Sequence, residues 1–216
     1  MKYIVGIDEV GRGPIAGPVA VCAFVCARQD LAHIVDNIDL PLRDSKKLTK
    51  IQREKWFTYL KEQKKNNFCD FAVSFVSAQN IDKFGINPSI QKALNKSLEK
   101  IVTSLNQNSF LFTPEGPYEI KNFDLQTSLS IYLDGGLKAP KEYINQETII
   151  KGDELHPVIS CASIIAKVSR DYVMAEYAKD YPDYGFEKHS GYGTKAHYSA
   201  IKKHGQTVLH RKTFIH

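Results

Sequence analysis

The 216-residue chain contains no apolar run that approaches the roughly 20 residues of a transmembrane helix. It also lacks the apolar core of a secretory signal, because Lys2 is followed by only five largely apolar residues before Asp8. We therefore expect a cytoplasmic protein with no membrane partner.

Cysteine is scarce and unpatterned. The four cysteines form no Cys-x-x-Cys pair. Cys22 and Cys26, on one face of an expected strand, would lie about 13 Å apart, which is too far for a disulfide. We expect all four to be reduced thiols, buried as small hydrophobic side chains.

Acidic residues are absent from residues 188–216, which carry six Lys or Arg side chains, whereas the net charge of the whole chain is only +5. A basic segment suits a polyanionic partner, although a solvated surface explains the charge equally well. The spacing of four histidines matches no zinc pattern, so no zinc site is expected among His189, His197, His204 and His210.

Apolar periodicity predicts a mixed α/β chain. Strands are expected at residues 3–8, 18–27, 71–76, 128–133 and 147–150. The short link between the first two favours a hairpin.

Four helices are expected. One begins with a capping box formed by Thr49 and Gln52, and a second begins with Asn87-Pro88 as N-cap and first residue. The others cover residues 157–179, whose first turns are rich in small side chains, and 195–204. We expect one α/β domain over residues 1–180, with a C-terminal helical extension, residues 181–216, packed on it.

Four carboxylates share one setting, the end of an expected strand beside glycine: Asp8, Glu9, Asp134 and Asp153. Strand ends are where α/β sheets build sites, although a turn or cap explains each acid taken alone. Clustered carboxylates repel unless a cation neutralises them, and an all-oxygen ligand set favours Mg²⁺ or Mn²⁺. Two such ions can hold a phosphodiester, activate water and stabilise the leaving oxygen.

Adjacent residues of a regular strand point to opposite faces. Asp8 and Glu9 are therefore expected to share a site only if the strand ends at Glu9 and the backbone turns. The glycines and proline of residues 11–14 make that turn feasible. The glycines on either side of Arg12 also leave the loop open to a sugar-phosphate backbone.

Six segments of the chain resemble the prokaryotic ribonuclease HII family: GIDEVGRGPIAGPV, DSKKLT, YLDGG, KGD, ISCASIIAKVSRD and YGFEKHSGYGT. They follow the family's order from Gly6 to Thr194. The loop at residues 11–13 favours this family over its sister, ribonuclease HIII, and we expect no extra N-terminal domain before it. The resemblance implies an RNase H-like fold with a central mixed five-stranded sheet flanked by helices and a C-terminal helical part.

The resemblance also implies a function. The family's activity is hydrolysis of the RNA strand of RNA–DNA hybrids and incision 5′ of ribonucleotides embedded in duplex DNA, leaving 3′-OH and 5′-phosphate ends. It implies that two Mg²⁺ or Mn²⁺ ions bind the catalytic Asp8, Glu9, Asp134 and Asp153. It further implies that the ribose 2′-OH is read by Gly11, Arg12 and Gly13, and that Tyr192 stacks beside the sugar.

Only the 2′-OH distinguishes RNA from DNA at one nucleotide, and backbone groups in a tight loop can read it without seeing the base. Four cations are candidates to grip phosphates, although surface charge explains them equally well: Lys46, Lys47, Lys167 and Arg170. Asp171 is expected to pair with Lys167 on the same helix and to be structural.

The chain departs from the family pattern in places. Gly136 stands where the family usually has Asn, and the segment 110–123 has no assigned place. The tail after His210 carries no evident clamp-binding motif, so the sequence gives no support to a replication-clamp partner, and a monomer is expected.

Two alternatives remain open. Another RNase H-fold nuclease, such as a resolvase or transposase core, would share the acids but gives no reason for the Gly-Arg-Gly loop. A non-catalytic nucleic-acid-binding protein would use the basic tail but has no need of four carboxylates or of Mg²⁺.

Overall fold

Five strands form one mixed sheet in the order β3-β2-β1-β6-β7. The computed structural model describes residues 3–107, 112–113, 116–117 and 128–215. β1 pairs antiparallel with β2 and parallel with β6, so the expected hairpin and mixed five-stranded sheet are confirmed. The bounds are Tyr3–Val10 for β1, Val19–Ala27 for β2, Cys69–Val76 for β3, Leu129–Asp134 for β6 and Gln146–Ile149 for β7.

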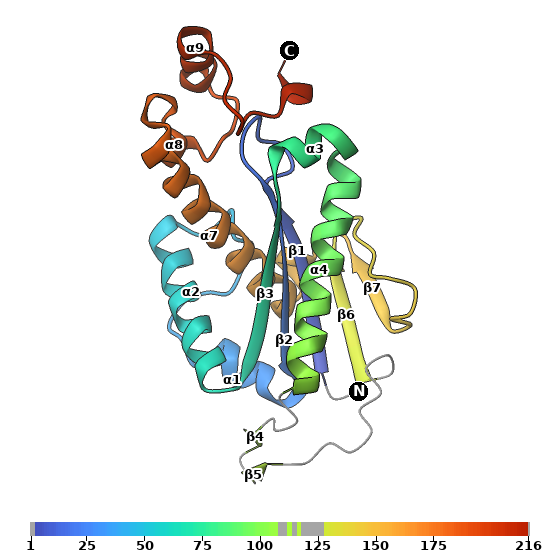
Figure 1. The fold of residues 1–216 in the computed structure, drawn as a ribbon. Helices are drawn as coiled ribbons and strands as arrows, with labels where there is room; N and C mark the ends of the chain where they lie inside the picture. Colours follow the sequence, from blue (N-terminus) through green and yellow to red (C-terminus); the bar gives the residue numbers. More distant parts are fainter. Residues whose placement is uncertain (1–2, 108–111, 114–115, 118–127, 216) are drawn as a thin grey trace.

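Helices cover both faces of the sheet (Figure 1). Helix α4, Ile86–Gln107, packs on one face, whereas α2, Lys50–Lys65, and α7, Pro157–Asp180, lie on the other. Alternate residues of β1 serve the two cores: Val5 belongs to the core under α4, and Ile4 to the core under α7. The central strand is therefore buried on both sides.

The remaining elements are short. They are α1 Leu31–Asp36, α3 Ala78–Phe84, α6 Gly152–Leu155, α8 Phe186–His189, α9 Lys195–His204 and the 3-10 turns Arg28–Asp30, Pro182–Tyr184 and Lys212–Phe214. Within the unassigned segment 110–123, β4 Phe112–Thr113 pairs with β5 Gly116–Pro117, and the rest lies outside the described residues. Across the described ranges, no helix is long and apolar enough to cross a membrane.

Two of the local expectations are confirmed and a third is wrong. The Thr49–Gln52 capping box is present, and all four cysteines are free and buried, as expected. The prediction that Asn87 caps a helix is wrong, because α4 already begins at Ile86. Gly85, with φ of 84°, ends α3 and turns the chain directly into α4.

One close approach positions the site. A Cβ atom at Gly6 would lie 2.1 Å from the Val158 carbonyl oxygen, so only glycine lets α7 pack directly on β1. This contact brings the first turns of α7, rich in small side chains, against the end of β1 that carries Asp8. The division of the chain at residue 180 stays a prediction.

Candidate active site

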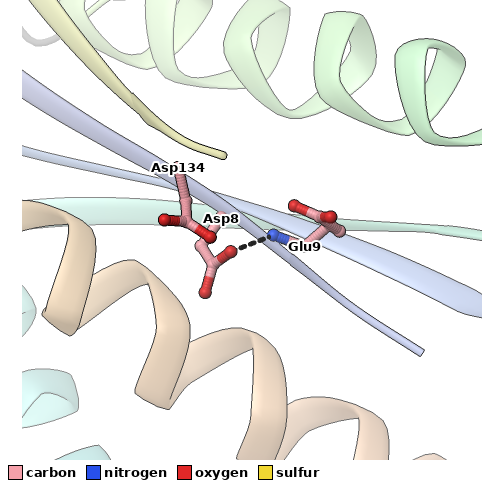
Figure 2. A group of neighbouring side chains, drawn as sticks. All are labelled: Asp8, Glu9 and Asp134. Atoms are coloured by element: carbon pink, nitrogen blue, oxygen red, sulfur yellow. Dashed lines mark hydrogen bonds between the residues drawn. The ribbon is translucent and has the colours of Figure 1, made fainter. Parts of the chain in front are cut away.

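Three carboxylates meet at one end of the sheet (Figure 2). One carboxylate oxygen of Asp8, one of Glu9 and one of Asp134 lie within 4.8 Å of one another. Asp8 and Glu9 lie near the end of β1, and Asp134 ends β6. Because β1 and β6 are parallel, their carboxyl ends meet at the same edge of the sheet.

We expected Asp8 and Glu9 to share a site only if the strand ended at Glu9, and this expectation is wrong. β1 continues to Val10, so both acids lie inside a regular strand. The pairing of β6 with β1 stops at Ile7 and Leu133, and this leaves the edge of β1 open beside the two acids. The Glu9 carboxylate can therefore approach Asp8 around that edge, while the Glu9 N–H donates to Asp8 Oδ1 at 2.7 Å.

Asp153 lies beside these three acids rather than among them. The neighbouring Gly152 N–H donates to Asp134 Oδ1 at 2.7 Å, and Lys46 Nζ lies 3.5 Å from Asp153 Oδ2. Burial raises the pKa of Asp153, the charges of Asp134 and Asp44 raise it further, and Lys46 opposes them. The fourth carboxylate thus contributes negative charge to the same neighbourhood.

Burial and mutual repulsion disfavour ionisation of the central acids. Burial raises the pKa of Asp8 well above its usual range, and the charges of Glu9 and Asp134 add to the effect. Burial also raises the pKa of Glu9, against the opposing hydrogen bond and charge of Arg12. Among the described residues, Glu9 Oε2 is buried without a hydrogen-bond partner.

A divalent cation fits this arrangement. Its charge would relieve the repulsion that raises the carboxyl pKa values, and it would supply a partner for the orphaned oxygen of Glu9. The donor set is entirely oxygen, which suits Mg²⁺ or Mn²⁺. The residues present are therefore suited to hold such an ion.

The Gly-Arg-Gly loop adjoins the carboxylates. Arg12 Nη1 lies 3.1 Å from Glu9 Oε1, and its Nη2 donates to Asn87 Oδ1 at 2.6 Å. On the other side, a Cβ placed on Gly13 would lie 3.9 Å from Tyr192 Cε1. The loop thus lies between Glu9 and the exposed Tyr192 ring.

The three candidate lysines each pair with an acid. Lys46 faces Asp153, as described, and Lys47 bonds Glu154. Lys167 Nζ lies 2.8 Å from Asp171 Oδ1, which is the intrahelical pair expected from the sequence. Lys46 and Lys47 are both exposed, and their contact with a phosphate stays a prediction.

Arg170 does not fit a direct phosphate contact. Its side chain is fully buried. Its three nitrogens donate at 2.8–3.2 Å to the carbonyls of Pro18, Ser190 and Ala16. Burial also lowers the pKa of its guanidinium to about 10. The expected role in gripping substrate is incompatible with this placement.

The comparisons with known proteins decide the family. A family model described as ribonuclease HII matches residues 5–216. The chain belongs to the ribonuclease HII family. It is 41% identical over 213 residues to ribonuclease HII of Endomicrobium trichonymphae, covering 98% of this chain and 84% of that protein. Its enzyme class is therefore that of a ribonuclease H endonuclease.

Solved structures of ribonucleases HII and HIII share the fold. The Archaeoglobus fulgidus RNase HII in its PCNA complex superposes with a TM-score of 0.68 at 23% identity, over 99% of this chain and 96% of that one. Bst-RNase HIII in complex with Mn²⁺ gives 0.67 at 18% identity, over 99% and 67%. The RNase H-like fold expected from the sequence is confirmed.

Sequence reasoning missed two residues that build the site of this ribonuclease HII. Asn87 holds Arg12, but its place before a proline suggested only a helix cap. Arg211 was counted in the basic tail, yet it is fully buried beneath the Gly-Arg-Gly loop. Nothing in the local sequence marks either contact, because both partners lie far away along the chain.

Proposed function

We propose that this ribonuclease HII cleaves the RNA strand of RNA–DNA hybrids and incises duplex DNA on the 5′ side of an embedded ribonucleotide. The products are 3′-OH and 5′-phosphate ends. The proposal includes two bound ions, Mg²⁺ or Mn²⁺, and the neighbouring RNase HIII complex with Mn²⁺ supports the choice of metal. We also propose that the protein is a monomer and acts in the cytoplasm.

The observation that carries the proposal is the contact between the acids and the loop. Arg12 bonds Glu9 on one side, and Gly13 lies under Tyr192 on the other. These contacts support assigning ribose recognition to the loop and cation binding to the neighbouring acids. Cleavage next to a ribonucleotide requires the group that recognises the ribose and the group that holds the ions to lie close together.

The acids would hold the ions, which supply Lewis-acid stabilisation of the scissile phosphate when bound. Asp8, Glu9, Asp134 and Asp153 are the residues assigned to this task. The Gly152 N–H orients the Asp134 carboxylate, and Arg12 orients that of Glu9. Such fixed hydrogen bonds limit the rotation of a ligand side chain and so preorganise the site.

We assign the substrate contacts to residues that surround the acids. Gly11, Arg12 and Gly13 read the 2′-OH, and Tyr192 stacks beside the sugar. The exposed ammonium groups of Lys46 and Lys47, with Lys167, contact phosphates and make binding salt-dependent. PCNA binding is a property of the Archaeoglobus protein, and our proposal contains no clamp partner.

The decisive assay offers duplex DNA with a single ribonucleotide, together with Mg²⁺, Mn²⁺ or EDTA, and maps the cut. We expect one incision, 5′ of the ribonucleotide, with either metal and none with EDTA. The 3′ end should be extendable by a polymerase, as a free 3′-OH requires.

An all-DNA duplex of the same sequence is the control and should stay intact. Cutting that persists in EDTA would contradict the metal-dependent mechanism. Cutting of the all-DNA duplex at a similar rate would contradict ribonucleotide recognition.

A further inference from the structure

The Arg211 guanidinium donates three hydrogen bonds to the loop that we assign to ribose recognition and to the residues that follow it. Its side chain is fully buried. Nη2 donates to the Gly11 carbonyl at 2.7 Å, Nη1 to that of Arg12 at 3.1 Å, and Nε to that of Gly17 at 2.9 Å. The partners of this buried cation are thus backbone carbonyls, which are fixed points of the loop.

These bonds determine which way the loop peptides face. No peptide bond in the described residues is cis, and in a trans peptide the N–H points away from the C=O. Because the Gly11 and Arg12 carbonyls point inward to Arg211, the N–H groups of Arg12 and Gly13 point the opposite way. Arg12 and Gly13 are both exposed, so the loop offers its donors at the surface, on the side away from Arg211.

The backbone around Arg211 is anchored to the same loop. The Arg211 N–H donates to the Ile15 carbonyl at 2.8 Å, and the Gly17 N–H donates to that of Leu209 at 2.8 Å. Asp82 in turn accepts hydrogen bonds from the N–H groups of Lys212 and Thr213. The segment after α9 therefore serves as a rigid support for the loop rather than as a free basic tail.

We propose that Arg211 is a positioning residue for ribonucleotide recognition, holding the loop carbonyls so that its N–H groups face the substrate. This inference rests on the function proposed above. Lysine cannot replace arginine here, because a compact ammonium on a flexible stem cannot donate along three fixed directions. A purely structural role would affect all nucleic-acid substrates alike, whereas this role affects the preference for a ribonucleotide.

The test measures binding without cleavage, in EDTA. Dissociation constants are compared for a duplex with one ribonucleotide and for the all-DNA duplex, and their ratio is the preference. For Arg211→Lys, we expect the preference to fall by about fivefold or more, the size of one net hydrogen bond. Affinity for all-DNA duplex should stay within about twofold of wild type, since the exposed cations are unchanged.

Two matched variants separate the possible causes. Lys212→Ala removes an exposed charge next to Arg211 and should weaken the binding of both duplexes equally. Trp56→Phe removes a buried hydrogen bond to Pro41 in a remote part of the fold and should leave the preference unchanged. An Arg211→Lys protein that keeps its preference within about twofold, or loses both affinities alike, would overturn the inference.

Should Arg211→Lys fail to fold, Asp82→Ala decides. It leaves Arg211 and the loop intact but frees the backbone that follows Arg211, and Asp82 is only partly buried. We expect a smaller drop in preference, of roughly two- to threefold, and an unchanged preference would overturn the inference. A wild-type protein that shows no preference at all would instead refute the proposed function.

Discussion

Asp134 carries two tasks in one side chain. Its Oδ1 accepts the Gly152 N–H at 2.7 Å, which holds the turn before Asp153, and its charge contributes to the group formed with Asp8 and Glu9. An amide oxygen can perform the first task but not the second. Substitution by asparagine therefore separates structure from chemistry.

For Asp134→Asn we expect the cleavage rate to fall on the order of 100-fold or more, because a ligand and a negative charge are lost. Binding of the hybrid in EDTA should stay within about twofold of wild type. Single-turnover cleavage and a binding titration measure the two quantities. Asp36→Asn, an exposed acid of α1, is the matched control and should cleave normally. A normal rate for Asp134→Asn would refute its assigned role.

The sequence predicts the positions of the site acids better than those of Arg170 and Arg211. The sequence predicts Asp8, Glu9 and Asp134 at or near strand ends close to glycine, and in the structure they lie in the last three residues of β1 and at the end of β6. The burial of Arg170 and Arg211 depends on carbonyl oxygens of residues 11–18, more than 150 positions away in the chain. Their residue type alone would assign both arginines to the surface, because a fully buried arginine is rare without partners.

At the scale of elements, β1 and α7 meet through Gly6. A methyl group there would lie 2.1 Å from the Val158 carbonyl oxygen and 2.6 Å from the Ile159 nitrogen. Both are backbone atoms, so no side-chain rotation can relieve the clash.

We therefore expect Gly6→Ala to lower the free energy of unfolding by at least about 2 kcal/mol. It should also slow cleavage, because α7 supports the end of β1. Urea unfolding measures the first effect. Gly136→Ala is the control: a Cβ there meets nothing within 4 Å, so its stability should change by less than about 0.5 kcal/mol. Equal stability of the two variants would show that the helix shifts freely.

A chain of hydrogen bonds through two histidines supports Tyr192. Thr207 N–H donates to His210 Nδ1 at 2.8 Å, the two Nε2 atoms of His210 and His197 lie 3.1 Å apart, and His197 Nδ1 lies 2.9 Å from the Tyr192 carbonyl. The carbonyl must accept, so His197 carries its proton on Nδ1 and His210 on Nε2. A further proton on either ring would break a bond in this chain.

Acid should therefore destabilise the C-terminal segment. Burial lowers the pKa of His197 to about 4, helped by the charges of His189, stacked on it at 4.4 Å, and of His210, and opposed by the hydrogen bond to the Tyr192 carbonyl. Burial lowers the pKa of His210 too. Unfolded histidine binds a proton near pH 6.5, so the unfolded state binds more protons below that pH. Stability is thus present above about pH 6.5 and is lost as pH falls toward about 4.

Thermal unfolding at pH 7.5 and 5.5 checks this sign. The buried carboxylates, whose pKa values are raised, act in the opposite sense, so the comparison is with a variant. We expect His197→Gln to have a lower Tm than wild type at pH 7.5 and a smaller deficit at pH 5.5. His33→Gln, in the exposed part of α1, should track wild type. A deficit that is constant with pH would contradict the role of the histidine pair.

Periodicity predicts the long elements and misses the short ones. The five strands of the sheet and helices α2, α4 and α7 were expected within a few residues of their bounds. Helices α1 and α3, with six and seven residues, contain too few turns to show a helical repeat. Asn87 was misassigned for the same reason, since α3 runs almost directly into α4 and hides the boundary.

At the scale of the whole molecule, the site joins four distant parts of the chain. β1 and β6 bring the acids, α7 supports them from below, and the segment around residues 190–211 holds the loop and Tyr192. Sheet order cannot be read from local patterns, because β1 pairs with β6 across more than 100 intervening residues. The convergence of the acids was predicted from their place at expected strand ends and from the family resemblance, without knowledge of the sheet order.

Metal binding should be visible as global stability. The fold confines three carboxylates whose oxygens lie within 4.8 Å, and the unfolded chain does not, so a divalent ion binds mainly the folded state. At about 100 times its dissociation constant, such an ion stabilises by roughly 2.7 kcal/mol. For a chain of this size we expect Tm to rise by about 5 °C or more over its value in EDTA.

Asp8→Asn separates the charge from the fold, because an amide oxygen can still accept the Glu9 N–H that Asp8 Oδ1 accepts now. Asp8 is the most deeply buried of the three acids, and its repulsion with Glu9 and Asp134 disappears in the variant. In EDTA, Asp8→Asn should therefore melt above wild type, and its rise in Tm with Mn²⁺ should be less than about half the wild-type value. Asp36→Asn should respond as wild type does. Equal Mn²⁺ shifts in Asp8→Asn and wild type would place the ion elsewhere and remove the basis for metal-dependent cleavage at this end of the sheet.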